Sequence, residues 1–167
     1  MKIDYLHNHP QHVQTIAEWH YSEWGLEDYS VAETVIGLHE YCDPSTSLPL
    51  ALIALENDEL LGVCQLKHHE LINHFPDLSP WLGGVFVPSS QRGIGIASKL
   101  VLHSIDVAYS LGIEKVYLHT KRLDGGIYQK LGWECLCIHQ GRTGESLVME
   151  RAVDSLRVHE AEPASDI

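Results

Sequence analysis

The sequence predicts one mixed α/β domain, in which a central mixed sheet with an antiparallel N-terminal meander is flanked by helices. Length is the first observation, since 167 residues suit a single domain with a sizeable core. The second is composition, because 44% apolar and 20% charged residues are typical of globular proteins. The third is the order of the predicted elements, which is strand, two helices, three strands, helix, strand, helix and two strands. This order lacks the regular strand–helix alternation of a doubly wound fold.

The first predicted elements are a strand and two helices. Residues 2–6 favour a short strand, and the helical spacing of apolar residues predicts a helix from Pro10 to Trp24. Proline is favoured in a first helical turn, and Gly25 is a suitable helix end. A second helix is expected over 30–41, because it begins with a serine that can cap it and has Glu33 three residues on.

The next elements form the meander. Leu50–Glu56 and Leu60–His68 predict a hairpin whose turn is Asn57–Glu59. Residues 81–87 form an apolar, β-branched segment that stops at Pro88, so they predict a buried strand. Three consecutive strands therefore lead into a glycine-rich turn.

The last elements complete the sheet. After the turn, the pattern predicts a long helix to about residue 110, a strand, a short helix and a closing hairpin. The ranges after the long helix are Lys115–Thr120, Gly126–Leu131, Trp133–His139 and Ser146–Glu150. We expect the domain to cover residues 1–151 and residues 152–167 to form a polar tail.

Composition and residue spacing limit the classes of molecule that the chain is expected to bind. A net charge of −12 argues against nucleic acid and suits a cationic small molecule or a basic peptide. No apolar run approaches the roughly 20 residues that cross a bilayer, so no membrane association is expected. The four cysteines lack CxxC spacing, which suits reduced thiols in a cytoplasmic protein. The spacing of His7, His9 and His12 does not favour a shared metal site.

The glycine-rich turn is the strongest functional signal. Between Pro88 and Ala97 a polar connector is followed by glycines that alternate with isoleucines, and a helical pattern comes next. A strand, a glycine-rich turn and a helix N-terminus together collect unpaired backbone N–H groups around an anion. Gly93 and Gly95 lack side chains, so a phosphate can approach the backbone closely. The pattern predicts pyrophosphate binding.

Two other phosphate-binding motifs fit less well. The P-loop pattern is absent, since Lys99 has no glycine before it and no hydroxyl residue after it. A dinucleotide turn needs its strand to end at the first glycine, whereas the connector 88–92 intervenes here. It also needs an acidic residue at the end of the next strand, whereas Glu114 begins that strand. A dinucleotide-dependent oxidoreductase is therefore a less favoured alternative.

Two motifs carry a resemblance to a known family. Arg92–Ala97 resembles the R/Q-x-x-G-x-G/A signature of the GCN5-related N-acetyltransferase (GNAT) family, and Ile127–Trp133 is similar to its (F/L)-Y-x-K-L-G-(F/W/Y) segment. The resemblance covers nearly the whole chain and implies a single-domain GNAT fold with central strands that splay near Gly84. The chain departs from the pattern at Lys121 and Asp124, where the family often has Asn and Ala. This departure affects expected side-chain contacts to the coenzyme arm.

The resemblance also implies how acetyl-CoA is held. Val85 and Val87 would bond to the pantetheine arm like an added strand. Backbone N–H groups of the turn would bind the pyrophosphate, helped by the helix dipole. The expected acetyl-CoA-binding residues are Val85, Phe86, Val87, Arg92, Gly93, Ile94, Gly95, Ile96, Ala97 and Ser98.

Acetyl transfer needs a polarised carbonyl, an acid for the thiolate and a base for the amine. The Val85 N–H is the candidate to polarise the thioester carbonyl. Tyr128 is the candidate acid, because a phenol stays protonated at neutral pH. The base is open: Glu70 is preferred, and the alternatives are His68, His69, His119 or a water molecule.

The acceptor site is expected at the end of the first long helix. Aromatic and acidic residues gather there, and they suit a cationic amine. Trp19, Trp24 and Glu27 are the expected substrate-binding residues, although core packing explains Trp19 equally well.

These observations favour an N-acetyltransferase that acts on a primary amine of a small molecule or peptide by direct attack in a ternary complex. A homodimer is compatible with the family. The main alternative is a non-catalytic acyl-CoA-binding or regulatory module on the same fold.

Overall fold

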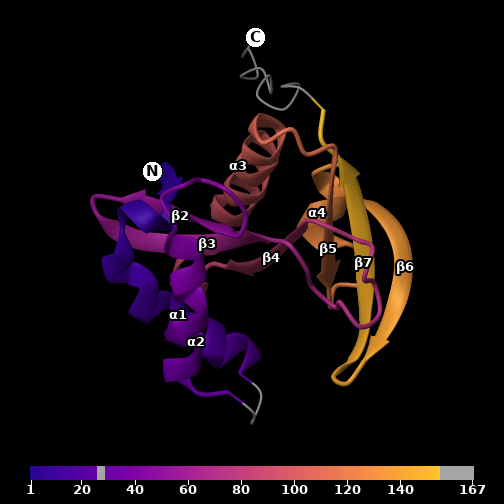
Figure 1. The fold of residues 1–167 in the computed structure, drawn as a ribbon, viewed down its shortest axis with the longest axis horizontal. Helices are drawn as coiled ribbons and strands as arrows, with labels where there is room; N and C mark the ends of the chain where they lie inside the picture. The colour runs from indigo at the N-terminus through magenta and orange to yellow at the C-terminus, as the bar shows by residue number, and fades with distance from the viewer. Residues whose placement is uncertain (26–28, 155–167) are drawn as a thin grey trace.

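The computed structural model describes residues 1–25 and 29–154, which form one seven-stranded sheet with flanking helices (Figure 1). The strands are β1 (Lys2–Tyr5), β2 (Leu50–Glu56), β3 (Glu59–Lys67), β4 (Trp81–Phe86), β5 (Lys115–Thr120), β6 (Glu134–Gly141) and β7 (Gly144–Ala152). The α-helices are α1 (Val13–Trp24), α2 (Val31–Leu38), α3 (Ile96–Ser110) and α4 (Gly126–Lys130). The predicted fold class and element order are confirmed.

The strand order is β1-β2-β3-β4-β5-β7-β6. The first four strands pair antiparallel in chain order, as expected for a meander. β4 pairs parallel with β5, and β7 lies antiparallel between β5 and β6. The sheet is therefore mixed, and its parallel junction lies between the meander and the C-terminal hairpin.

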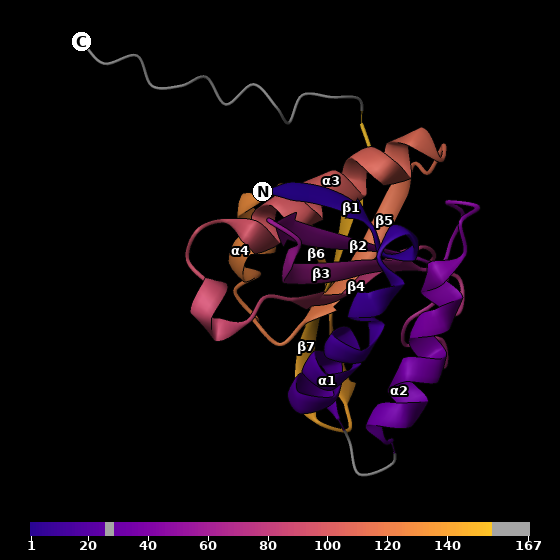
Figure 2. The same ribbon diagram turned by 90° about the vertical axis from the view of Figure 1, so that its left-hand side faces the viewer.

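The two faces of the meander bury different residues. Along β2, Leu50, Leu52 and Ala54 join the core cluster that contains Leu100 and other residues of α3. The intervening Ala51, Ile53 and Leu55 join the cluster that contains residues of α1 and α2. Figure 2 shows α1 and α2 on the opposite side of these strands from α3. Burial on both faces explains why β2 is an unbroken apolar segment.

The predicted splay of the central strands is confirmed. β4 and β5 share a single register pair, Trp81 with Tyr117, and then separate. On its other side, β4 pairs Gly83 with Gln65 and Phe86 with Val63, so β4 carries one extra residue there. This bulge contains Gly84, whose φ of +57° is in the left-handed region that favours glycine.

Several element boundaries differ from the predictions. Pro10 begins a 3-10 turn over 10–12, and α1 starts only at Val13. The capping box of α2 is present, because Ser30 and Glu33 bond reciprocally, but α2 ends at Leu38 and a 3-10 turn follows. These short turns add a few residues that a helical apolar pattern cannot distinguish from α-helix.

A further correction concerns Gly25, and the end of the sheet is seen at Ala152. Gly25 caps α1 with a φ of −59°, so it is not a left-handed cap; a Cβ there would overlap the Tyr21 carbonyl oxygen. The sheet continues past residue 151, since Ala152 pairs with Lys115 and the Val153 N–H donates to Glu114. β7 therefore pairs along the whole of β5. Within the described residues, no helix is long and apolar enough to span a bilayer.

Candidate active site

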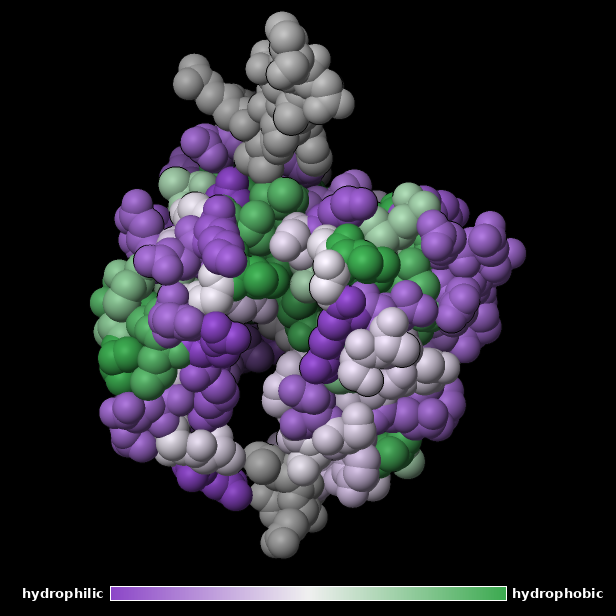
Figure 3. All heavy atoms as spheres, turned by 180° about the vertical axis from the view of Figure 1, so that it is seen from behind, coloured by the Kyte–Doolittle hydropathy of each residue, from purple (hydrophilic) through white to green (hydrophobic). Residues whose placement is uncertain are grey.

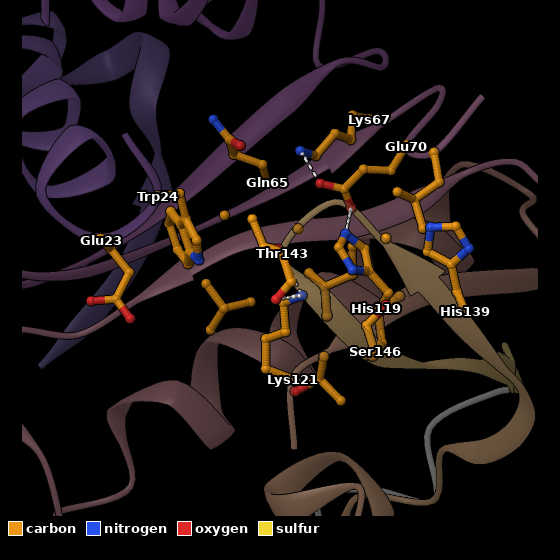
Figure 4. A pocket seen from close by; sticks show the side chains of 18 of the residues that line it. Glu23, Trp24, Gln65, Lys67, Glu70, His119, Lys121, His139, Thr143 and Ser146 are labelled. Atoms are coloured by element: carbon orange, nitrogen blue, oxygen red, sulfur yellow. Dashed lines mark hydrogen bonds and ion pairs between the residues drawn. The ribbon is translucent and has the colours of Figure 1, made fainter. Parts of the chain in front are cut away.

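A cavity of about 1130 Å³ lies where β4 and β5 separate. Its wall is formed by the end of α1, the end of β3, the bulge of β4, β5, α4 and the β6–β7 hairpin. Figure 3 shows the surface hollowed between the half that contains α1 and α2 and the half that contains β5 to β7. Figure 4 shows Glu23 and Trp24 on one side of this pocket and His119, Ser146 and His139 on the other. The split in the sheet is therefore a real opening between side chains.

The bulge of β4 fixes the direction of one backbone N–H, that of Val85. His20 Nε2 lies 3.1 Å from the Gly84 oxygen. A carbonyl oxygen can only accept, so Nε2 carries the hydrogen and donates. Gly84 C=O and Val85 N–H belong to one trans peptide and point in opposite directions. The bond from His20 therefore holds the Val85 N–H pointing away from His20, and Val85 lines the cavity.

His20 keeps one protonation state near neutral pH. Burial is the main cause that lowers its pKa to about 4, and Lys67 lowers it further, while the bond to Gly84 acts in the other direction. A neutral ring with its hydrogen on Nε2 is thus a fixed donor to the bulge. The sequence motifs did not single out this histidine, which lies in the helix expected over residues 10–24.

Glu70 lies in a small charged cluster on the cavity wall (Figure 4). Its carboxylate is 2.7 Å from Lys67 Nζ and 3.7 Å from His119 Nε2. Burial is the main cause that lowers the pKa of His119, and the Glu70 carboxylate opposes it. His119 is therefore a neutral imidazole beside a carboxylate, which is an arrangement that can accept a proton.

The other two base candidates lie outside the cavity wall. His68 Nε2 bonds to the Leu48 carbonyl oxygen at 3.0 Å, and His69 is exposed. Glu70 is followed in the turn after β3 by Leu71, whose φ is +52°. Of the four candidates, the structure brings Glu70 and His119 together at the cavity.

Tyr128 reaches the cavity from α4. Burial is the main cause that raises its pKa to about 12, and electrostatic interactions with Cys64 and Glu70 raise it further. Its ring packs against Trp133 in an edge-on arrangement, with the ring centroids 6.2 Å apart. The phenol is therefore protonated at neutral pH and can donate a proton.

The glycine-rich turn does not belong to the cavity wall. Residues 92–98 are absent from its lining and lie at the start of α3 instead. Gly93 and Gly95 have φ values of +88° and +83°, and a Cβ on either would meet open space. The first bond of α3 runs from Lys99 N–H to the Gly95 oxygen, so the N–H groups of Ile96 and its two successors have no helical acceptor. The turn can hold a pyrophosphate.

The remaining residues expected at the coenzyme differ in what they contact. Val87 and Ile96 are buried in the core next to α3, and Val85 packs against that core. The Arg92 side chain is already engaged: Nε donates to the Val87 oxygen at 2.8 Å, and the guanidinium lies 5.9 Å from the Phe86 ring centre. Ala97 and Ser98 are half-buried, whereas Ile94 is exposed.

The residues that are expected to bind the acceptor lie in different places in the structure. Trp24 lines the cavity and is 49% exposed. Trp19 does not line it; its ring packs against Phe86 with the centroids 5.3 Å apart, in the core below α1. Glu27 lies outside the described residues, and Glu23 is the α1 carboxylate at the wall.

Several wall residues carried no signal in the sequence. Gln65, His74, His139, Thr143 and Ser146 come from elements far apart in the chain. In the described part of the chain, no group of three or more His, Cys, Asp or Glu residues is arranged to hold a metal ion. The pocket thus brings titratable side chains of several elements together, and the glycine-rich turn lies apart from it.

Comparison with known proteins agrees with this geometry. The family model described as the acetyltransferase (GNAT) family matches residues 13–133. No curated protein matches the chain.

Solved structures match over nearly the whole chain. An aminoglycoside 6'-acetyltransferase type Ii is 23% identical with a TM-score of 0.72, and covers 92% of this chain and 98% of its own. An aminoglycoside 6'-N-acetyltransferase complexed with coenzyme A is 19% identical with a TM-score of 0.73, over the same shares of 92% and 98%. A ribosomal-protein-alanine N-acetyltransferase from Brucella melitensis is 15% identical with a TM-score of 0.72, over 91% and 99%. The TM-scores and the coverage show a common fold.

Proposed function

The chain belongs to the acetyltransferase (GNAT) family, and we propose that it transfers the acetyl group of acetyl-CoA directly to a primary amine of a small molecule or peptide. One observation carries the proposal: the sheet splits beside a bulge whose Val85 N–H faces away from His20, and Tyr128 and Glu70 line the same cavity. These groups supply a carbonyl-polarising donor, an acid and a base in one place.

The binding of acetyl-CoA is supported by two features of the backbone. The gap between β4 and β5 leaves β4 without a partner on that side, so an extended pantetheine arm can pair with Val85 and Val87. The open turn at Gly93 and Gly95 suits the pyrophosphate at the N-terminus of α3. When bound in this way, acetyl-CoA supplies the activated thioester.

His20 and Val85 act together on the thioester carbonyl. The Val85 N–H donates to the carbonyl oxygen, which gains negative charge as the amine attacks. The bond from His20 to the Gly84 oxygen polarises the same peptide group and holds its orientation. His20 is thus a positioning residue, because it acts through the Gly84–Val85 peptide.

Proton transfer balances the reaction. As the new N–C bond forms, the amine gives up a proton to His119 or Glu70, directly or through a water. As the C–S bond breaks, Tyr128 donates its phenolic proton to the departing sulfur. The carboxylate of Glu70 also stabilises a positive charge on His119.

Direct transfer is supported by the state of the cysteines. Cys64 is buried, and burial is the main cause that raises its pKa to about 12, so it is not a nucleophile. Burial also raises the pKa of Cys42. Neither thiol lines the cavity. An acyl-enzyme on either cysteine is therefore disfavoured, and attack by the amine in a ternary complex fits better.

A ligand panel tests the proposal against its alternatives. Thermal unfolding of the full chain is followed with acetyl-CoA, CoA, NAD and ATP, and thiol release is then measured with a broad amine panel. We expect stabilisation by acetyl-CoA and CoA only, and thiol release with at least one amine. Preferential stabilisation by NAD would contradict the proposal. Stabilisation by CoA without thiol release from any amine would favour a regulatory module.

A further inference from the structure

Among the described residues, the pocket is lined by more cationic than anionic side chains, whereas the whole chain has more acidic than basic residues. The chain has 23 acidic residues and 11 lysines and arginines. Among the described residues, four cations line the pocket, namely Lys67, Lys121, Arg122 and Arg142. The carboxylates at the same wall are those of Glu23 and Glu70. Cationic side chains are therefore enriched at this cavity relative to the acidic chain as a whole.

Two of these cations are neutralised by neighbours. Lys67 pairs with Glu70 at 2.7 Å, and Arg122 pairs with Asp124 at 2.8 Å. Lys121 is different, because in the described part of the chain it forms no ion pair. Its ammonium is 2.8 Å from Thr143 Oγ1 and 3.3 Å from the carbonyl oxygens of Thr143 and Gly144. These oxygens are uncharged, so none of the three contacts neutralises the charge of the Lys121 ammonium.

The same bonds hold Lys121 in place. It follows β5 directly, and Thr143 belongs to the turn between β6 and β7. Figure 4 shows Lys121 reaching toward Thr143 within the pocket, with Trp24 on one side and His119 on the other. Since the ammonium is already positioned, little side-chain freedom is lost when it binds an anion.

We propose that the amine acceptor carries a carboxylate and that Lys121 binds this carboxylate. The inference rests on the proposed acetyl transfer and names the acceptor class of that site: a small amino acid rather than a polycationic amine. An ammonium has three N–H groups, so the carboxylate takes over one that now reaches a carbonyl oxygen at 3.3 Å and replaces it with a charge-assisted hydrogen bond. A polyamine would instead bring a second positive charge close to the Lys121 ammonium.

Matched acceptors test the inference. Each amino acid in a panel is compared with its own carboxamide, which keeps the amine and the side chain but removes the negative charge. A polyamine is the third arm, and a short peptide with a free N-terminal amine and an acidic side chain is the fourth. We expect kcat/KM for the preferred acid to exceed that for its amide by about 10- to 100-fold. The carboxylate favours the protonated amine, so intrinsic reactivity would produce the reverse order.

Variants of Lys121 test whether this side chain causes the preference for the acid over its amide. Lys121→Met should lower kcat/KM about 10- to 100-fold for the acid and less than about twofold for the amide. Lys121→Arg should retain the preference for the acid. Lys2→Met is the matched control, because Lys2 lies in β1 at the far edge of the sheet and its side chain is 63% exposed. The dissociation constant of CoA is measured for every variant and should not change.

The outcomes separate this inference from the proposed function. Efficient acetylation of the amides or the polyamine, with no advantage for the acids, would overturn the carboxylate inference and leave acetyl transfer standing. An equal loss for acid and amide in Lys121→Met would also overturn it. A preference for the acidic peptide over every free amino acid would contradict the small-acceptor class. No turnover with any amine would contradict the proposed function and this inference with it.

Discussion

The donor side and the acceptor side of the proposed site are built from different chemical groups. On the donor side, the groups are backbone atoms from short continuous segments, the unpaired part of β4 and the turn at Gly93 and Gly95. On the acceptor side, the groups are side chains from α1, β3, β5 and the β6–β7 hairpin. Backbone groups suit a donor of fixed chemistry. Side chains from several elements can change the acceptor while the fold stays the same.

The largest expected effect is at Tyr128, where the two sides meet. Replacing Tyr128 with Phe removes the proton donor to the sulfur and keeps the ring that packs on Trp133. We expect kcat to fall by about 10²- to 10⁴-fold with no change in the dissociation constant of CoA. Steady-state thiol release and calorimetry measure the two quantities. The control is Tyr109→Phe, a half-exposed tyrosine of α3. Unchanged turnover in Tyr128→Phe would remove Tyr128 from the mechanism.

The second prediction tests the donor side alone. Gly95→Val places a β-branched residue at a φ of +83°, so the turn has to change its conformation. Binding of CoA should weaken by about 100-fold or more, since the turn presents several N–H groups at once. Gly112→Val is a matched control, because Gly112 has a φ of +72°, equally open space and a place at the far end of α3. If both variants bind CoA equally well, the turn is not the pyrophosphate site.

The third prediction tests the hydrogen bond from His20, on the acceptor-side helix α1, to the donor-side peptide of Gly84. His20→Ala removes the donor to the Gly84 oxygen and should lower kcat by about 10- to 100-fold. His20→Gln can still donate and should recover part of the loss. The Kd of CoA should be the same in both variants, which separates loss of orientation from loss of folding. Equal activity of the Ala and Gln variants would contradict a role for the hydrogen bond.

The smallest effect at neutral pH is expected for the base. Because burial lowers the pKa of His119, the ring is neutral at pH 7 and gains a proton only below its ordinary value of about 6.5. If His119 accepts the amine proton, kcat falls as the pH drops through that region. His119→Gln should lower kcat at pH 7 by about tenfold, since Glu70 lies beside it, and should remove this acid limb. A retained limb would assign the base to another group.

The donor side could be predicted from the sequence because its information is local. A strand, a glycine turn and a helix follow one another, and the geometry that they impose belongs to the backbone itself. Gly84 is less obvious, since its bulge is defined only by the register against Val63 and Gln65 on β3.

The acceptor side could be predicted only in part. Helical spacing cannot tell that Trp19 packs on Phe86 while Trp24 faces the cavity. Three consecutive polar residues follow β3, and only the turn geometry turns Glu70 rather than His68 toward His119. Lys121 was visible as a departure from the family pattern, but its position beside Thr143 depends on the pairing of β5 with β7.

Direct transfer of the acetyl group is the central claim, and one measurement tests it most directly. The full chain is incubated with acetyl-CoA labelled in its acetyl group and a panel of amino acids, and the reaction is stopped during turnover. Mass spectrometry then locates the label. We predict that the label appears on the amine of an amino acid and not on the protein. Label on a cysteine of the protein during turnover, or no label on any amine while CoA stays tightly bound, would contradict the account.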